Sequence, residues 1–250
     1  MIIIPYRLAV RNKDVKAAGL QTDDIQNKGK IKTAALNFAA GCGKISRHDK
    51  GTVKAMDNDF FALISRMRYI ERWSLMRNSI RENVQEHSHM VAVIAHALGV
   101  IRRDVLGIPC DVNACAAVAL YHDASEILTG DLPTPIKYHD DEIMSAYRRV
   151  EKLASDKLLA MLPEELQGAF APILNGETER ELHDLVKAAD KMSAYIKCIE
   201  ERKAGNNEFA SAEKQTLAAL HAYNMPEVEY FIGHFIPAFE KTLDELGSIE

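Results

Sequence analysis

The sequence predicts an all-α fold. From residue 57 onward, apolar residues recur at three- and four-residue spacing in one segment after another. No segment alternates apolar and polar residues convincingly, and no glycine-rich phosphate loop is present, which argues against a parallel-sheet nucleotide fold. With 250 residues, of which 47% are hydrophobic, the chain is long enough for one sizeable core with an appendage.

The first 55 residues differ from the rest in apolar pattern and in charge. They have no sustained apolar period and contain eleven Lys or Arg against four Asp or Glu, a net charge of +7. Because the whole chain carries −5, the remainder carries −12. We expect residues 1–55 to form a weakly ordered basic extension, and residues 56–250 to form one helical domain that does not require it.

The apolar stripes and the breaks between them predict the helices in order. A stripe that includes Phe60, Ile64 and Met67 opens the domain. Prolines and glycines then separate the later segments, as at Pro109 and Gly130. The helices expected after the opening stripe cover residues 83–103, 113–128, 141–161, a short segment after Pro163, 179–203 and 231–246.

Composition also limits the cellular setting. No run of about eighteen apolar residues exists, so we expect no membrane span. The four cysteines form no C-x-x-C pair, which favours reduced thiols and the cytoplasm. They are Cys42, Cys110, Cys115 and Cys198. The acidic domain argues against a nucleic-acid surface, since phosphate backbones are bound by clustered Lys and Arg.

Four polar residues fall where the predicted helices should face inward. His87 lies on the apolar stripe of the 83–103 segment, His122-Asp123 interrupts an apolar helix, and Asp190 lies on the inward face of the 179–203 segment. Each residue alone is weak evidence for a metal site. An inward histidine more often lines a pocket, and an inward aspartate more often caps a helix or pairs with a basic residue. Together they predict a divalent-metal site, since a cation offsets the cost of burying carboxylates.

The residues around these positions resemble one family closely. The order His, His-Asp, Asp resembles the HD superfamily of metal-dependent phosphohydrolases, and longer blocks look like bacterial YfbR-type 5′-deoxynucleotidases. The resemblance covers roughly residues 57–245. Its blocks are ERWSLMRN (71–78), ENVQEHS (82–88), YHDASEILTGDLPTP (121–135) and AGNNEF (204–209).

The resemblance implies an HD-domain helical bundle that hydrolyses deoxyribonucleoside 5′-monophosphates to deoxynucleoside and phosphate. It also implies a homodimer and a divalent cation such as Co²⁺ or Mn²⁺. The implied metal ligands are His87, His122, Asp123 and Asp190. The implied substrate-binding residues are Arg72, Trp73, His87, Asp131 and Asp190, and the implied catalytic residues are Glu126, Asp131 and Arg72.

The chemistry of each side chain is consistent with its implied role, and each residue could instead have a purely structural role. Arg72 can hold phosphate oxygens as a charged fork, or be a surface arginine. Glu126 follows His122 by four residues on a continuous helix and can transfer protons, or merely orient His122. Asp131 can share the proton transfer or bond the sugar 3′-hydroxyl. Trp73 can exclude a ribose 2′-hydroxyl, or simply pack in the core.

Two other functions fit part of the pattern. An HD phosphohydrolase acting on cyclic nucleotides or nucleoside triphosphates would keep the same metal site. A catalytically idle nucleotide-binding module would keep the pocket but lose turnover.

Overall fold

The computed structural model describes residues 58–137, 139–176 and 178–247, all within the compact unit Ala55–Glu250. The predicted basic extension and Cys42 lie outside the described residues. Helices dominate, and the described residues contain no strand beyond one isolated bridge between Glu71 and Asn83. None of the described helices is both long and apolar enough to cross a membrane. The all-α prediction is confirmed.

The elements follow one another along the chain with short connections. The α-helices are α2 (Phe60–Ile64), α3 (Val84–Val100), α4 (Val112–Tyr121), α5 (Glu126–Thr129), α6 (Thr134–Lys137), α7 (Asp141–Leu159), α8 (Glu164–Leu174), α9 (Arg180–Lys203), α10 (Ala210–Ala222) and α11 (Pro226–Phe239). Three short 3₁₀ turns, η3 (Ser65–Tyr69), η5 (Asn207–Phe209) and η6 (Leu243–Glu245), and one π-helical turn, η4 (Ile101–Val105), complete them.

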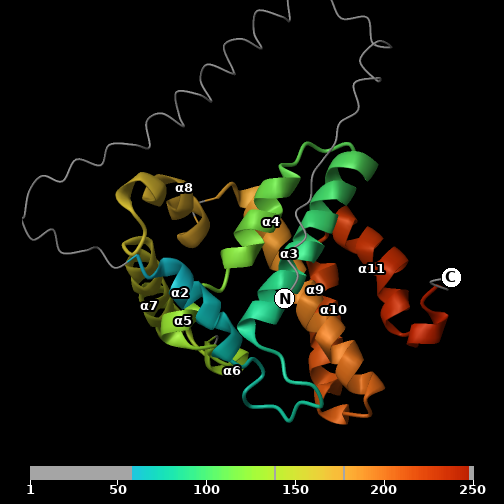
Figure 1. The fold of residues 1–250 in the computed structure, drawn as a ribbon. Helices are drawn as coiled ribbons and strands as arrows, with labels where there is room; N and C mark the ends of the chain where they lie inside the picture. Colours follow the sequence, from blue (N-terminus) through green and yellow to red (C-terminus); the bar gives the residue numbers. More distant parts are fainter. Residues whose placement is uncertain (1–57, 138, 177, 248–250) are drawn as a thin grey trace, which may run out of the picture. The chain divides into compact units, whose positions relative to one another are not determined.

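The main core lies around α3 and α9, which pack side by side (Figure 1). The helix α4 covers α3, while α10 and α11 pack against α9. Leu98 of α3, Met192 of α9 and Leu220 of α10 are fully buried in this core. The side chain of Asn83 accepts the backbone N–H of Glu86 and caps α3, which fixes where that helix begins. These packed helices provide a rigid frame for the polar side chains that lie between α3 and α9.

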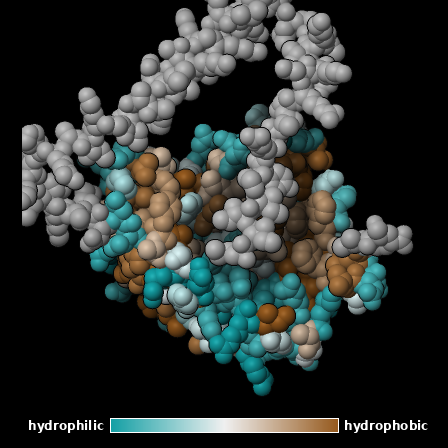
Figure 2. Space-filling view, in the orientation of Figure 1, coloured by the Kyte–Doolittle hydropathy of each residue, from teal (hydrophilic) through white to brown (hydrophobic). Residues whose placement is uncertain are grey.

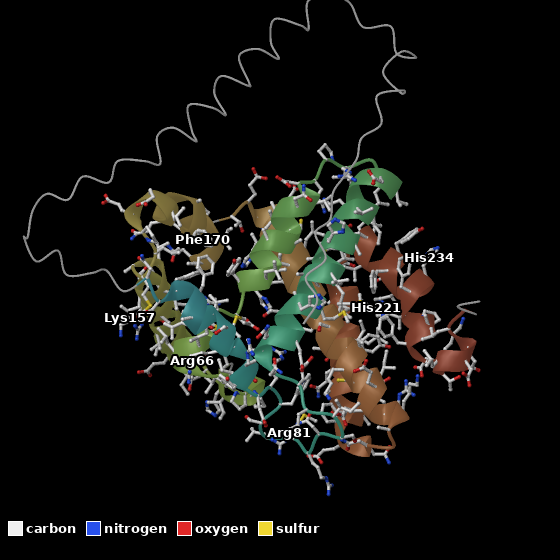
Figure 3. The ribbon with its side chains drawn as sticks, in the orientation of Figure 1. Arg66, Arg81, Lys157, Phe170, His221 and His234 are labelled. Atoms are coloured by element: carbon white, nitrogen blue, oxygen red, sulfur yellow. The ribbon has the colours of Figure 1, made fainter. Side chains whose placement is uncertain are left out.

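A second, smaller core joins α2 to α7 and α8. Phe60 and Leu158 are completely buried there. Phe170 of α8 points toward α2 and α4 (Figure 3), with its ring edge-on to Phe60 at 5.4 Å and to Tyr121 at 5.8 Å. This cluster anchors the end of α4, just before His122.

Four of the predicted helices agree with the structure. The segment 83–103 forms α3 and continues as the π-helical η4, and 141–161 and 179–203 correspond to α7 and α9. The short helix after Pro163 is α8, whose first turn begins at Glu164.

Two helix predictions are wrong, and one helix was missed. The segment 113–128 is not one helix, because α4 ends at Tyr121 and α5 begins only at Glu126. The last helix, α11, spans Pro226–Phe239 rather than 231–246, and its start agrees with the preference of proline for the first turn of a helix. The helix α10 was not predicted at all, because its alanines give it only a weak apolar stripe.

Candidate active site

His87 lies at the centre of the site, on the first turns of α3. Its side chain is buried, and its Nδ1 is 3.2 Å from the hydroxyl of Ser193 on α9. Its Nε2 lies 3.0 Å from Oδ1 of Asp190 and 3.7 Å from Oδ2 of Asp123. The Nε2 atom is buried and makes no hydrogen bond of acceptable geometry, although Asp190 lies close. This nitrogen is therefore free to bind a ligand that the carboxylates also contact.

His122 presents a second free nitrogen to the same point. Its Nδ1 lies 2.7 Å from the carbonyl oxygen of Ala119, and a carbonyl can only accept, so Nδ1 donates. The Nε2 atom then faces Asp123 at 3.1 Å and is buried without a hydrogen-bond partner. A backbone bond that fixes one ring nitrogen and frees the other is typical of metal-binding histidines.

The same contact lies at the break after α4. In a continued helix the carbonyl of Ala119 would accept the backbone N–H of Asp123. Here the His122 ring takes that carbonyl, and the chain turns until α5 begins at Glu126. The expectation that Glu126 sits one helical turn beyond His122 on a continuous face is therefore wrong.

Three ligand atoms cluster tightly enough for one cation. Atoms of His87, His122 and Asp190 all lie within 4.8 Å of one another. Asp123, the fourth predicted ligand, is not in that group, but its Oδ2 lies close to both imidazole Nε2 atoms, as given above. Two orphaned ring nitrogens beside two carboxylates make a donor set that fits a divalent cation such as Zn²⁺, Mn²⁺ or Co²⁺.

The electrostatics of the cluster also favour a bound cation. Burial by itself lowers the pKa of His122, but the carboxylates of Asp123 and Asp190 outweigh it and raise the pKa to about 9. Burial by itself raises the pKa of Asp123, and the imidazoles of His122 and His87 lower it to about 2. The pKa of Asp190 is far below its usual range for the same reason. The site thus attracts positive charge, which a cation can supply in place of a proton.

Arg72 lies beside the cluster, in the segment 72–82 that leads into α3. Its Nη1 is 3.3 Å from Oδ2 of Asp123, and its Nε is 3.3 Å from Oε2 of Glu82. Its side chain is 13% exposed, so it is not the surface arginine of the alternative interpretation. Burial tends to lower its pKa, but Asp123, Asp190 and other carboxylates raise it, so the guanidinium stays charged.

Trp73 adopts an unusual backbone conformation next to Arg72. Its φ of +57° lies in the left-handed region, which a bulky residue rarely enters. Its indole Nε1 donates to Oε2 of Glu82 at 2.8 Å, and its ring packs 5.3 Å from Phe209. These two contacts hold the strained conformation in place.

Glu126 and Asp131 lie where the chain leaves the cluster. Glu126 is 6% exposed, and its Oε2 is buried without a hydrogen-bond partner. Burial, assisted by Asp123 and Asp131, raises its pKa to about 9. Gly130, at φ +73°, ends α5 and turns the chain toward Asp131, whose pKa is also raised, chiefly by burial. Burial and these neighbouring carboxylates therefore favour the protonated form of Glu126.

A cavity of about 640 Å³ opens beside these residues. The predicted residues Arg72, Trp73, Asp131 and Asp190 line it. Sequence reasoning missed its far wall, which α9 and α10 form. That wall consists of Lys191, Ala194, Ala212, Gln215, Thr216 and Ala219. The small alanines leave room for a ligand, and no motif around them identified the wall in advance.

The other histidines that the structure describes lie outside the ligand cluster. Five are exposed and His183 is half-buried, and none belongs to the ligand cluster found among the described residues. His221 and His234 lie on α10 and α11 (Figure 3), where His221 pairs with Glu229 and His234 stacks on Tyr230. The others are His89, His96 and His139.

Comparison with known proteins decides the family. The sequence profile described as "5′-deoxynucleotidase YfbR-like" matches residues 59–239. The chain belongs to the YfbR-like 5′-deoxynucleotidase family. A 5′-deoxynucleotidase of Vibrio parahaemolyticus is 48% identical over 192 residues, covering 76% of this chain and 99% of that protein. The 5′-deoxynucleotidase YfbR of Escherichia coli O1:K1 is 48% identical over 189 residues, covering 75% and 95%.

Solved structures confirm the HD-domain fold of this YfbR-like chain. An HD-domain phosphohydrolase from Listeria innocua superposes with a TM-score of 0.65 at 26% identity, covering 72% of this chain and 88% of that one. The HD phosphohydrolase of cyanophage S-2L, bound to dA and one catalytic Zn²⁺ ion, has a TM-score of 0.52 at 20% identity, covering 72% and 96%. The predicted family and fold class are therefore confirmed.

Proposed function

We propose that this chain hydrolyses deoxyribonucleoside 5′-monophosphates to the deoxynucleoside and phosphate, with one divalent cation held by His87, His122, Asp123 and Asp190. The family and its 48% identical 5′-deoxynucleotidases support the reaction. One observation supports the site above all others. Two buried imidazole Nε2 atoms without partners face two carboxylates at the edge of a nucleotide-sized cavity.

Arg72 is the proposed phosphate-binding residue. Its charge persists despite burial, and it lines the cavity beside Asp190. Because Asp123 and Glu82 already hold its Nη1 and Nε, the guanidinium plane is fixed before the substrate arrives. A bound divalent cation supplies Lewis acidity at the phosphate and makes water acidic enough to react near neutral pH.

Glu126 is the proposed proton donor and acceptor. Since His122 is already oriented by the Ala119 carbonyl, Glu126 is not needed to orient it. Its unpartnered carboxyl oxygen and raised pKa suit a group that gives a proton to the leaving 5′-oxygen. Asp131, which lines the cavity, is proposed to bind the sugar 3′-hydroxyl and to assist with the proton.

Trp73 is the proposed sugar selector. Its indole lines the cavity in a conformation fixed by Glu82 and Phe209. A rigid ring against the sugar leaves no space and no hydrogen-bond partner for a 2′-hydroxyl, so deoxyribose is preferred.

Cofactor and location are proposed on more general grounds. Mixed imidazole and carboxylate ligands suit Mn²⁺, Co²⁺ and Zn²⁺, and the cyanophage relative in fold binds Zn²⁺. The described cysteines, Cys110, Cys115 and Cys198, are free thiols, which supports a cytoplasmic location.

A homodimer is proposed from the family resemblance. In the face shown in Figure 2, hydrophobic residues reach the surface over α2, α7 and α8. Phe61, Val150, Leu153 and Leu166 of these helices are among the exposed apolar side chains. Association with a second copy would remove such surface from water.

A phosphate-release assay tests the function. Enzyme reconstituted with Mn²⁺, Co²⁺ or Zn²⁺ is given dAMP, AMP, dATP and cyclic AMP in parallel, and the nucleoside and nucleotide products are separated and measured together with the released phosphate, because hydrolysis of cyclic AMP to AMP releases none. We expect phosphate from dAMP in preference to AMP, and neither dATP nor cyclic AMP consumed. Turnover of dATP or cyclic AMP alone would instead assign the site to another nucleotide class, and metal-dependent dAMP binding without turnover would indicate an idle module.

A further inference from the structure

A polar row runs along the buried side of α9, and it begins at the proposed metal site and continues past it. Asp190, Ser193, Lys197 and Glu201 follow one another at spacings of three and four, so they share one face of the helix. Ser193 contacts His87, as described. Lys197 and Glu201 are 4% and 1% exposed and form an ion pair at 2.5 Å. The catalytic and substrate roles proposed above do not use this pair.

The pair binds the segment 72–82, which carries Arg72 and Trp73. The carboxylate of Glu201 accepts the backbone N–H of Ser79 at 2.8 Å and that of Ile80 at 3.2 Å. The ammonium of Lys197 donates to the carbonyl oxygen of Ile80. Both ends of the ion pair therefore hold the main chain of this segment, and its side chains are not involved.

Neighbouring residues add further contacts between α9 and the segment 72–82. Asn206 donates one amide N–H to Glu201 at 2.8 Å and the other to the carbonyl of Arg77 at 2.7 Å. The Lys197 ammonium lies 5.9 Å from the ring of Phe209, and Phe209 packs against Trp73. Contacts thus run continuously from the ion pair to the indole that lines the cavity.

Stability alone does not account for such a pair. A buried ion pair is commonly no more stabilising than well-packed apolar residues of the same volume, because both charges lose their hydration. What the pair adds is geometry, since a carboxylate with several directed donors allows few alternative positions for the segment.

We propose that Lys197 and Glu201 are positioning residues that hold the segment 72–82 against α9, so that Arg72 and Trp73 face the nucleotide. This inference rests on the proposed function. Because Asp190 belongs to the same helix, α9 fixes the substrate-binding segment and a metal ligand relative to one another. Loosening the pair should weaken nucleotide binding while the metal ligands stay in place.

Trp73 makes a direct test available, because it is the only tryptophan of the chain. In folded full-length Glu201→Gln protein we expect a red-shifted emission and at least about twofold stronger acrylamide quenching, because the indole becomes more accessible. For dAMP we expect KM to rise by about tenfold or more, with kcat changed less than about threefold and the metal content unchanged. Lys197→Met provides a second variant that should give the same pattern if Glu201→Gln does not fold.

Glu227→Gln is the matched control. Glu227 is also a fully buried carboxylate in an ion pair, with Arg102 at 2.7 Å, but no described contact joins it to the segment 72–82. Its substitution should lower the melting temperature while the emission, quenching and KM remain those of the wild type. Unchanged emission and KM in both α9 variants, or equal changes in the Glu227→Gln control, would overturn the proposal. If the wild type fails to hydrolyse dAMP, the proposed function fails, and the emission and quenching measurements still decide the positioning role.

Discussion

The Nε2 atom of His87 lies 3.0 Å from Oδ1 of Asp190, although 102 residues separate the two along the chain. The packing of α3 against α9 brings them together, and the Ser193 hydroxyl on the other ring nitrogen fixes the imidazole plane. This contact links the two helices at the proposed metal site.

Asp190→Ala should abolish tight metal binding. A carboxylate ligand is lost, so activity should fall by more than the roughly 10- to 100-fold that outer-sphere changes typically cause. Metal content after desalting and phosphate release from dAMP measure the two effects. Asp184→Ala, on the same helix and paired with Arg180, is the control and should retain both. Normal metal content in Asp190→Ala would remove Asp190 from the proposed ligand set.

Glu126→Gln should lower kcat for dAMP by roughly 100- to 10,000-fold, with KM nearly unchanged, because an amide of the same shape cannot transfer a proton. The metal content should remain normal, since Glu126 is not a proposed ligand. Steady-state kinetics give both constants. If kcat falls less than about tenfold, the main acid–base residue lies elsewhere, and Asp131→Asn is the next variant to measure.

Trp73→Ala should relax sugar selection. The ratio of kcat/KM for dAMP to that for AMP should fall by about tenfold or more, because space for the 2′-hydroxyl appears. Tyr69→Ala removes a nearby aromatic ring that is 69% exposed, and it should leave the ratio unchanged. An unaltered ratio in Trp73→Ala would assign the selection to another wall of the cavity.

The stability contributed by Glu201 should depend on pH in the acid range. Burial by itself raises its pKa, but Lys197 and the backbone N–H of Ser79 outweigh it and lower the pKa from 4.5 to about 2. The stabilisation is therefore complete above pH 4.5 and disappears as the pH falls through 2, and the shift corresponds to about 3 kcal/mol. Urea unfolding of wild type and Glu201→Gln between pH 2 and pH 7 should show their difference shrinking toward acid.

Glu200 provides the opposite case on the same helix. Its pKa is raised, chiefly by partial desolvation of the carboxylate, so its ionisation opposes folding. Relative to wild type, Glu200→Gln should therefore gain stability as the pH rises. A pH-independent difference for Glu201→Gln would contradict the electrostatic explanation.

A chain that begins at Met56 should keep the melting temperature and the dAMP activity of the full chain. The family profile begins at residue 59, and the Vibrio relative is matched over 99% of its length by 76% of this chain. Thermal unfolding and phosphate release of residues 56–250 provide the comparison. A large loss of either quantity would show that the domain requires the residues before it.

Sequence reasoning reached the helices with strong apolar stripes and the residue types that bind metals. It identified His87 and Asp190 because a polar side chain on an apolar face must have a partner. It could not predict the break after Tyr121, because residues 113–128 carry apolar residues throughout and no proline or glycine marks the break. Nor could it predict the left-handed Trp73, whose conformation depends on Glu82 and on Phe209, 136 residues further on.

The part of the cavity wall that α10 forms could not be predicted from the sequence either. Ala212 and Ala219 matter because of the space they leave, and an absent side chain gives no pattern in a sequence. The Lys197–Glu201 pair was also missed, since an i,i+4 pair of opposite charges usually indicates an exposed helix face. Its burial follows from the segment 72–82 folding over it.

Glu82 accepts from both Arg72 and Trp73, so the proposed phosphate and sugar contacts depend on one carboxylate. A substitution of Glu82 that moves Trp73 would therefore also move Arg72 and disturb phosphate binding. Among the described residues, no hydrogen bond or ion pair joins α10 to that carboxylate, so the alanines of α10 can be enlarged independently. Substitutions at Ala212 and Ala219 should accordingly reshape this side of the cavity while the Arg72 and Trp73 contacts to Glu82 stay in place.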